Sequence, residues 1–291
     1  MTIATRQVGS VEVVALLDGR AVLEDAITDA FPGAPVEELI AAKTSHPDLY
    51  GPGDTWRIFT RAWLVRHPGG VLLFDTGVGG ASSPSMEWFP EPGRLPDALA
   101  EAGVSAEEIE TVAISHVHDD HVGGTVNDAG KPAFVNARYV LQAADRNLLR
   151  DAPPDDEEDR VVWDRLVHPL EDAGVLDVVE GDVPLGPGLE LHLASGHTPG
   201  HQVLRISAGG EAMLLCADTW NHPLQFANPD WHSGPDRDPA AAAATRRVLL
   251  KELLAAPRTV IAPTHLAEPF GRVETGEDGP AWVPLDDAPL I

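Results

Sequence analysis

The chain has 291 residues, 43% hydrophobic and 23% charged, which is ordinary for a globular protein with a substantial core. Its 46 acidic and 20 basic residues give a formal net charge of −26. Because such a charge repels phosphate backbones and anionic lipids, we expect neither nucleic acid nor a membrane as a partner.

Three further features concern the location of the protein. The N-terminal sequence lacks a signal-peptide pattern, and no apolar run approaches the roughly 18 residues of a membrane span. The single cysteine, Cys216, has no partner for an intrachain disulfide and suits a reducing compartment. Together these features favour a cytoplasmic protein.

The first half of the chain combines apolar strands with short helices. Strands are predicted at 11–19, 60–67, 71–77 and 111–115, where β-branched or aromatic residues are bounded by turn residues. A helix is expected at 94–102, and Ser105 with Glu108 has the spacing of a capping box. The last of these strands places His116 at its carboxyl end.

The second half repeats this plan. Strands are predicted at 137–142, 189–195, 201–207, 212–218 and 259–265, with a helix at 239–255. Two similar β/α units of this kind predict an α/β fold in which two sheets face each other with helices outside, a four-layer αββα sandwich. We expect one domain over 1–291, with halves of roughly 1–150 and 160–291. The acidic stretch 151–160 is the expected connection, a solvated loop leading into a helix.

Segment 19–56 has apolar residues with weak periodicity and several glycines and prolines. Long irregular segments in compact domains often form lids or binding loops. Two interpretations therefore stand side by side, a cover over the active site and a plain surface excursion.

The stretch "AISHVHDDHVGG" at 113–124 concentrates metal-ligating groups. His116 and His118 stand two apart, so in an extended backbone their side chains reach one centre. Asp120 and His121 are adjacent and can point to a second centre beside the first. The glycine pair that follows lets a helix begin close to the site, where its dipole favours anions.

Three more candidate ligands follow apolar strands later in the chain. His197 lies in "SGHTPGHQ", Asp218 in "LLCADTW" and His265 in "IAPTHL". Such positions are expected at a shared sheet edge. Nitrogen and oxygen ligands without a thiolate suit zinc, and equally iron, manganese or cobalt.

This set resembles the metallo-β-lactamase superfamily, from "VLLFDTGVG" to "APTHL". The resemblance implies two divalent metal ions, with zinc as the first expectation. It assigns His116, His118 and His197 to one ion, and Asp120, His121 and His265 to the other, with Asp218 bridging. A hydroxide shared by the two ions would then attack a carbonyl or phosphoryl group.

Other residues receive roles from the resemblance or from their places in the sequence. Asp120 would orient the hydroxide and carry a proton to the leaving group. Asp75, in "LFDTG", would fix a ligand histidine, although a loop cap is the plainer interpretation. Asp119 is expected to face solvent, His201 to be structural and Cys216 to be a core residue.

Within the superfamily, the pattern resembles the branch of N-acyl-homoserine lactonases and methyl-parathion-hydrolase-like enzymes. The best-known lactonases carry a tyrosine shortly after the bridging aspartate, whereas this chain has Trp220, Asn221 and His222 there. His222 is therefore a candidate catalytic residue that assists at the carbonyl, and a packing residue in the alternative. Trp220, Phe226 and Trp231 form either an apolar substrate wall or core.

These observations predict a dinuclear metal-dependent hydrolase of a carboxylic ester or lactone, with a small neutral molecule as its partner. The alternative is an aryl phosphotriester hydrolase. A β-lactamase or thioesterase is less favoured, because the export signal and the basic C-terminal region of those groups are missing. A metal-binding protein without catalytic activity is a further alternative. The sequence leaves the oligomeric state open, a homodimer included.

Overall fold

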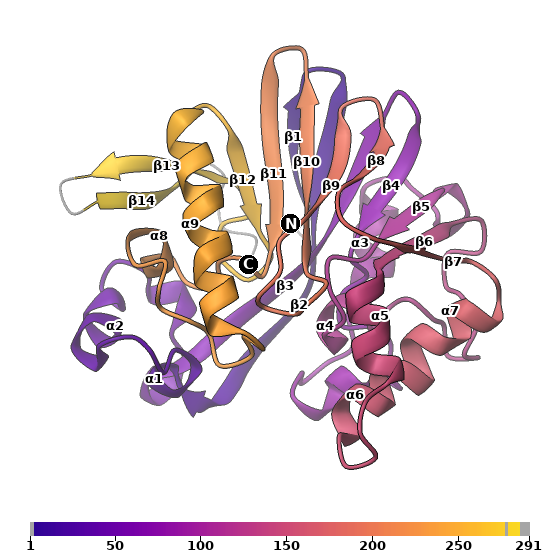
Figure 1. Ribbon diagram of the computed structural model, residues 1–291, viewed down its shortest axis with the longest axis horizontal. Coiled ribbons are helices and arrows are strands. Elements are labelled where there is room, and N and C mark those ends of the chain that lie inside the picture. The colour runs from indigo at the N-terminus through magenta and orange to yellow at the C-terminus, as the bar shows by residue number, and fades with distance from the viewer. Residues whose placement is uncertain (1–2, 277–278, 286–291) are drawn as a thin grey trace.

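The computed structural model describes residues 3–276 and 279–285, which form two seven-stranded sheets with helices on their outer sides (Figure 1). The strand order is β1-β2-β3-β4-β5-β6-β7 in the first sheet and β14-β13-β12-β11-β10-β9-β8 in the second. The four-layer αββα architecture expected from the sequence is confirmed.

The first sheet begins with antiparallel neighbours and continues with parallel ones from β4 onward. Its strands are β1 Ile3–Val8, β2 Val11–Ala26, β3 Thr55–His67, β4 Gly70–Phe74, β5 Thr111–Ala113, β6 Arg138–Gln142 and β7 Leu176–Val179.

The second sheet is antiparallel except for the parallel pair β11 and β12. Its strands are β8 Val183–Gly186, β9 Leu189–Leu193, β10 Gln202–Ala208, β11 Glu211–Ala217, β12 Val260–Pro263, β13 Gly271–Gly276 and β14 Gly279–Pro284.

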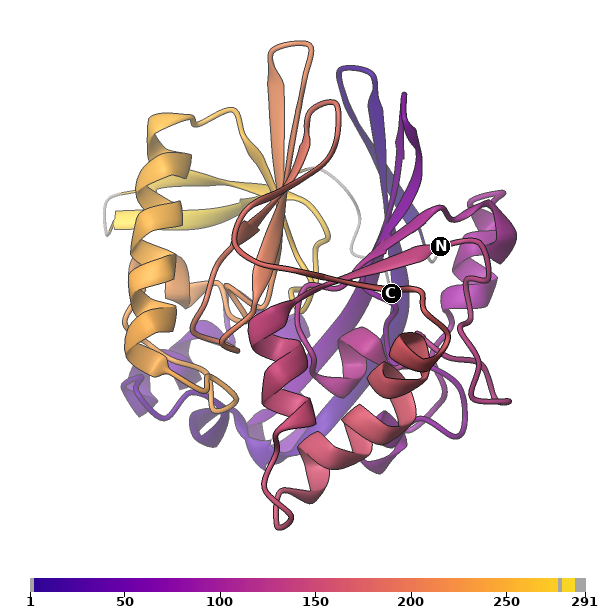
Figure 2. The ribbon, with the colours of Figure 1, turned by 45° about the vertical axis from the view of Figure 1, so that its right-hand side comes forward.

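Helices form the two outer layers. The α-helices are α1 Ile27–Ala30, α2 Val36–Ala42, α3 Leu95–Glu101, α4 Asp119–Val122, α5 Ala143–Arg150, α6 Glu157–Val162, α7 His168–Asp172, α8 Leu224–Ala227 and α9 Pro239–Ala255. In Figures 1 and 2, α5–α7 cover the first sheet and α9 the second. Among the described residues, none of the helices is both long and apolar enough to cross a membrane.

Two buried clusters hold these layers together. One contains inward-facing residues of both sheets, such as Trp63 and Leu215, and thus joins the two halves. The other lies between the first sheet and its helices and includes Leu73, Tyr139 and Leu166. Each layer is therefore fixed by apolar burial, which places the strand ends of both sheets at one edge.

Several boundaries differ from the sequence prediction; β3, for example, begins at Thr55 and not at 60. Strand β2 continues to Ala26, beyond the end expected at 19, because shifts in register near Gly19 let it stay paired with β3. The sheets change between β7 and β8, so the acidic stretch 151–160 is not the connection between them. Its expected form, a loop leading into a helix, is confirmed by α6.

Candidate metal centre

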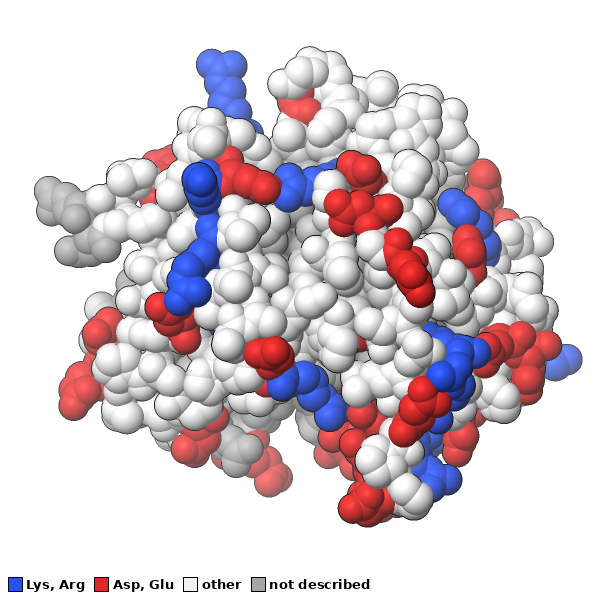
Figure 3. Space-filling model, in the orientation of Figure 1, with Lys and Arg blue, Asp and Glu red and all other residues white. Residues whose placement is uncertain are grey.

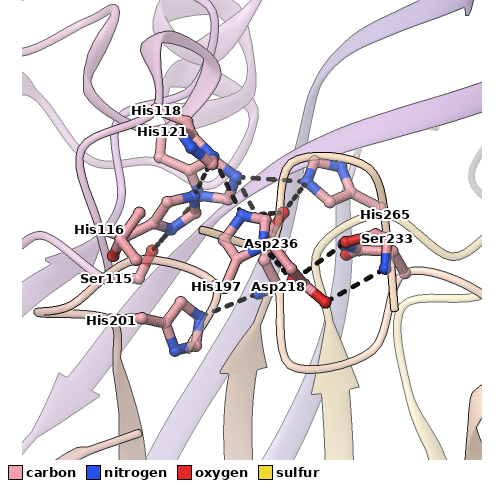
Figure 4. Close-up of polar contacts among 12 residues, drawn as sticks. Ser115, His116, His118, His121, His197, His201, Asp218, Ser233, Asp236 and His265 are labelled. Carbon is pink, nitrogen blue, oxygen red and sulfur yellow. Dashed lines mark hydrogen bonds and ion pairs between the residues drawn. The ribbon is translucent and has the colours of Figure 1, made fainter. Parts of the chain in front are cut away.

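The seven predicted ligands meet where the strands of both sheets end. Figure 4 shows His116, His118, His121, His197, Asp218 and His265 at this edge. Six of the seven ligands are at most 5% exposed, and only His118 is half-buried. Their ligating atoms form three groups that could each hold a metal ion. The first is His116/His118/His197 and the second is Asp120/His121/His265, and a third, His116/His121/Asp218, lies between them.

The first group consists of three imidazole nitrogens. His118 Nδ1 lies 3.0 Å from His116 Nε2 and 3.0 Å from His197 Nε2. Ligands of a tetrahedral zinc ion, bound at about 2.0–2.1 Å, stand about 3.3 Å apart. The three nitrogens therefore lie at nearly the spacing that one such ion requires.

The second group adds carboxylates. His265 Nε2 lies 3.2 Å from His121 Nε2, and both nitrogens lie 3.7 Å from Asp120 Oδ2. Asp218 stands between the groups, with Oδ2 3.0 Å from His265 Nε2 and 3.3 Å from His197 Nε2. Its position is that of a bridging ligand.

For three of the rings, a hydrogen bond at the far side fixes which nitrogen faces the centre. His197 Nδ1 donates to Asp236 Oδ1 at 2.8 Å, and His265 Nδ1 donates to the Phe59 carbonyl at 2.7 Å. His121 Nδ1 donates to Asp75 Oδ2 at 2.9 Å. Because each Nδ1 carries the proton, the Nε2 lone pair of each ring points inward.

Ser115 and Asp75 connect the two groups. Ser115 Oγ donates to Asp75 Oδ2 at 2.8 Å and lies 2.9 Å from His116 Nδ1, from which it accepts. Asp75 thus holds His121 directly and His116 through the serine. Its backbone has a positive φ of 65°, a strained conformation for a residue other than glycine, which the Ser115 N–H bond to Oδ1 supports.

The electrostatics of the cluster are those of a negative site that needs cations. Burial raises the pKa of Asp218, but His265, His121 and His197 outweigh it and hold that pKa well below its usual range. Burial lowers the pKa of His121, yet Asp120 and Asp218 hold it well above the ordinary value. Without metal, a proton on His121 therefore balances part of the carboxylate charge.

The donor set fits divalent cations. Inward lone pairs about 3 Å apart repel one another unless a cation lies between them. Asp218 Oδ1 is buried and faces His121 Nε2 at 3.1 Å, a nitrogen whose lone pair also points inward. Nitrogen and oxygen donors without a thiolate suit zinc and related first-row metals.

A cavity of about 1010 Å³ opens onto this cluster. His118, Asp120, Asp218 and His265 lie in its lining. Its apolar wall comes from residues 21–23, Trp56, Ile58 and the segment 88–90. Segment 19–56 thus contributes to the cavity through the end of β2 and the start of β3.

The aromatic side chains of 220–231 do not form the substrate wall. The cavity lining does not include Trp220, Phe226, Trp231 or His222. Trp220 stacks on Phe226, which stacks on Trp282, so the core interpretation holds for the first two. The wall expected from 220–231 is instead supplied by β2, β3 and the segment after β4.

His222 is 1% exposed and packs edge-on against Phe31 and Tyr50. Its Nδ1 accepts from Leu224 N–H, and its Nε2 lies 3.3 Å from the Tyr50 hydroxyl. Burial lowers the pKa of His222 to about 3, so the ring is neutral. This placement gives no support to assistance at a substrate carbonyl, and we do not assign that role to His222.

Two other expectations concern neighbours of the ligands. His201 is structural, because its Nε2 accepts from Asp218 N–H and its Nδ1 donates to the Ala194 carbonyl. Asp119 lines the cavity instead of facing open solvent, and its Oδ2 accepts from the Trp88 indole at 3.1 Å.

Three side chains that contact the ligands are not indicated by the sequence motif. Ser115 directly precedes His116, so its position at the same strand end was the available signal. Thr60 Oγ1, which donates to Asp120 Oδ2, and Asp236, which also accepts from Arg246, lie far from the motif in sequence. Only the fold brings them to the site.

The αββα fold with a buried His/Asp cluster at the shared sheet edge defines a class of metal-dependent hydrolases. The family model described as the metallo-beta-lactamase superfamily matches residues 56–265. The chain belongs to this superfamily, and it is a metal-dependent hydrolase.

Individual proteins of known name or structure show a more specific similarity. An N-acyl homoserine lactonase from Bacillus sp. is 26% identical over 220 residues, which cover 69% of this chain and 80% of the relative. The solved structure of AidC, a dizinc quorum-quenching lactonase in complex with a product, N-hexnoyl-L-homoserine, has a TM-score of 0.85 at 25% identity and 98% coverage of both chains. Hydrolase AbOPH, at 20% identity, shows the same fold, with a TM-score of 0.84 and coverage of 99% of this chain and 98% of its own.

Proposed function

We propose that the protein is a dinuclear lactonase or carboxylic ester hydrolase, with zinc as its native metal. The observation that carries this proposal is the meeting of two ligand groups around Asp218 at the floor of a largely apolar cavity. The likeness to a dizinc lactonase and to N-acyl homoserine lactonases supports it.

His116, His118 and His197 would hold one ion, and Asp120, His121 and His265 the other, with Asp218 shared. Bound divalent ions supply Lewis acidity and lower the pKa of a shared water toward neutrality.

The side chains around the ions fix their ligands and move a proton. Asp75, Asp236 and the Phe59 carbonyl hold the ligand rings in one tautomer. Thr60 fixes the Asp120 carboxylate through Oδ2. In the proposed reaction, Asp120 accepts the proton of the attacking water and returns it to the leaving alkoxide.

The cavity wall favours a neutral substrate with an apolar part. Trp56, Trp88 and Phe89 offer aromatic surface, and its burial contributes roughly 25 cal/mol per Å². Glu24, Glu87 and Glu158 also line the cavity and outnumber its two arginines. In Figure 3, acidic side chains are spread over the visible face with basic ones between them. A polyanion would thus be repelled, whereas a lactone or ester is not.

An aryl phosphotriester is the second candidate, because it is also neutral and its ring would fit the aromatic wall. The test is a hydrolysis screen of purified protein with measured zinc content. It compares N-acyl homoserine lactones, other lactones, aryl esters and aryl phosphotriesters. We expect hydrolysis of at least one lactone or ester, abolished by chelation and restored by zinc. Efficient turnover of phosphotriesters alone would contradict the substrate class but not the metal chemistry.

Replacing Trp88 by alanine is expected to raise KM about tenfold for a long-chain lactone or ester and to leave kcat nearly unchanged. The indole contributes apolar wall that binds ground state and transition state alike, and losing about 60 Å² of contact corresponds to that factor. Steady-state kinetics over a series of chain lengths measures the effect. Trp163→Ala, in the outer helical layer, is the matched control. Equal KM changes in both variants would contradict this role for Trp88.

A further inference from the structure

Arg61 in β3 is fully buried, and its hydrogen-bond partners are backbone carbonyls instead of a carboxylate. Its Nη1 donates to the Leu266 carbonyl and, at 2.9 Å, to the Thr264 carbonyl. Its Nη2 donates to the Ala267 carbonyl at 2.6 Å. Burial lowers the pKa of Arg61 to about 9, so the side chain stays charged at neutral pH.

The three carbonyls belong to the loop that carries His265. Residues 264–269 follow β12 and form neither helix nor strand, and residues 264–267 are at most 3% exposed. A buried irregular loop leaves carbonyls without the partners that regular structure or water would supply. The Arg61 guanidinium supplies those partners on both sides of His265.

Strand β3 contacts the second ligand group at two further points. The Phe59 carbonyl accepts from His265 Nδ1, and Thr60 Oγ1 donates to Asp120 Oδ2. Successive side chains of a strand point to opposite faces, so Thr60 and Arg61 reach opposite directions. Three consecutive residues of β3 thus contact a metal ligand or the loop that carries one. Phe59 and Arg61 contact His265 and its loop, and Thr60 contacts Asp120.

We propose that Arg61 is a positioning residue that sets the affinity of the second metal ion by fixing the loop around His265. This inference rests on the proposed dinuclear site. The first ion, held by three histidines that do not belong to this loop, is affected little. A planar guanidinium with two Nη atoms reaches three carbonyls, which the single ammonium of lysine does less completely.

The test measures zinc bound per chain in wild-type protein, Arg61→Met and Arg61→Lys after dialysis against a series of fixed free zinc concentrations. In Arg61→Met we expect the first ion to bind as in wild type. The affinity for the second ion should fall about 10- to 100-fold, the range for residues that orient metal ligands. Arg61→Lys is expected to lower the affinity for the second ion by a smaller factor, at least about threefold. Excess zinc should restore most of the kcat of both variants.

Arg66→Met is the matched control, because Arg66 lies in the same strand and bonds to Glu12 and to the Ala102 carbonyl, away from the site. It should bind both ions as wild type does. If Arg61→Met does not unfold cooperatively on heating, Arg61→Lys decides the question. Equal weakening of both ions, or wild-type binding of both, in the folded variants overturns the inference. A wild-type protein that binds one ion overturns the dinuclear site and this inference together.

Discussion

Replacing Asp218 by alanine is expected to lower kcat/KM by at least about 10³-fold and to reduce the bound metal to one ion or fewer per chain. Asp218 lies between the two ligand groups, within 3.3 Å of nitrogens from His197, His265 and His121. Its loss removes the carboxylate that the inward Nε2 atoms of these three imidazoles share. Steady-state kinetics and metal analysis of the purified variant measure both effects.

Cys216→Ala is the matched control for this experiment. Cys216 lies two residues earlier in β11, is fully buried and belongs to the core cluster, so its thiol has no part in the site. Its kcat/KM should stay within about threefold of wild type. His201→Ala should fall between the two, because His201 holds the Asp218 backbone. A Cys216 variant that folds normally yet loses as much activity as Asp218→Ala would show that the ligand assignment is wrong.

The strands that carry the ligands were predictable because two independent sequence patterns coincide at the end of each one. An apolar run marks a buried strand, and a histidine or aspartate directly after it marks the strand end. Residues 111–116 show this, since Val112 and Ala113 of the short strand β5 are buried and His116 follows three residues after the strand ends. Where both patterns coincide, sequence reasoning places a side chain at the sheet edge without knowledge of the fold.

The cavity wall was less predictable, because an aromatic side chain has the same pattern whether it faces a core or a substrate. Trp220 and Trp88 illustrate this ambiguity. Trp220 is fully buried and stacked on Phe226, whereas Trp88 lines the cavity and is held by Asp119. Neither outcome depends on local sequence. It depends on which distant segment packs against each ring.

The partners that orient the ligands were also hidden, for a related reason. The Phe59 carbonyl that fixes His265 is a backbone group present at every residue, so no residue type can announce it. Asp236 lies in a polar loop before α9, where an aspartate is expected for turn formation alone. Contacts between segments far apart in sequence can therefore be identified only once the fold is known.

The variant Asp120→Asn is expected to lower kcat about 10²- to 10⁴-fold, the range that general acid–base groups supply, with a smaller change in KM. The substitution keeps the size of the side chain and an oxygen for Thr60 to bond, but removes the negative charge and the capacity to accept a proton. Asp120 Oδ2 lies 3.7 Å from both His121 Nε2 and His265 Nε2, so the charge is lost beside the second ligand group.

Asp119→Asn provides the control, because it removes the same charge one residue away. Asp119 also lines the cavity, but its carboxylate accepts from the Trp88 indole, and an amide oxygen can accept the same bond. Its kcat should therefore stay within about threefold of wild type. Metal analysis of both variants separates loss of the proton carrier from loss of the second ion. If Asp120→Asn keeps two ions and wild-type kcat, Asp120 carries no proton in the reaction. If both variants lose activity equally, the effect belongs to the charge of the cavity and not to the position of Asp120.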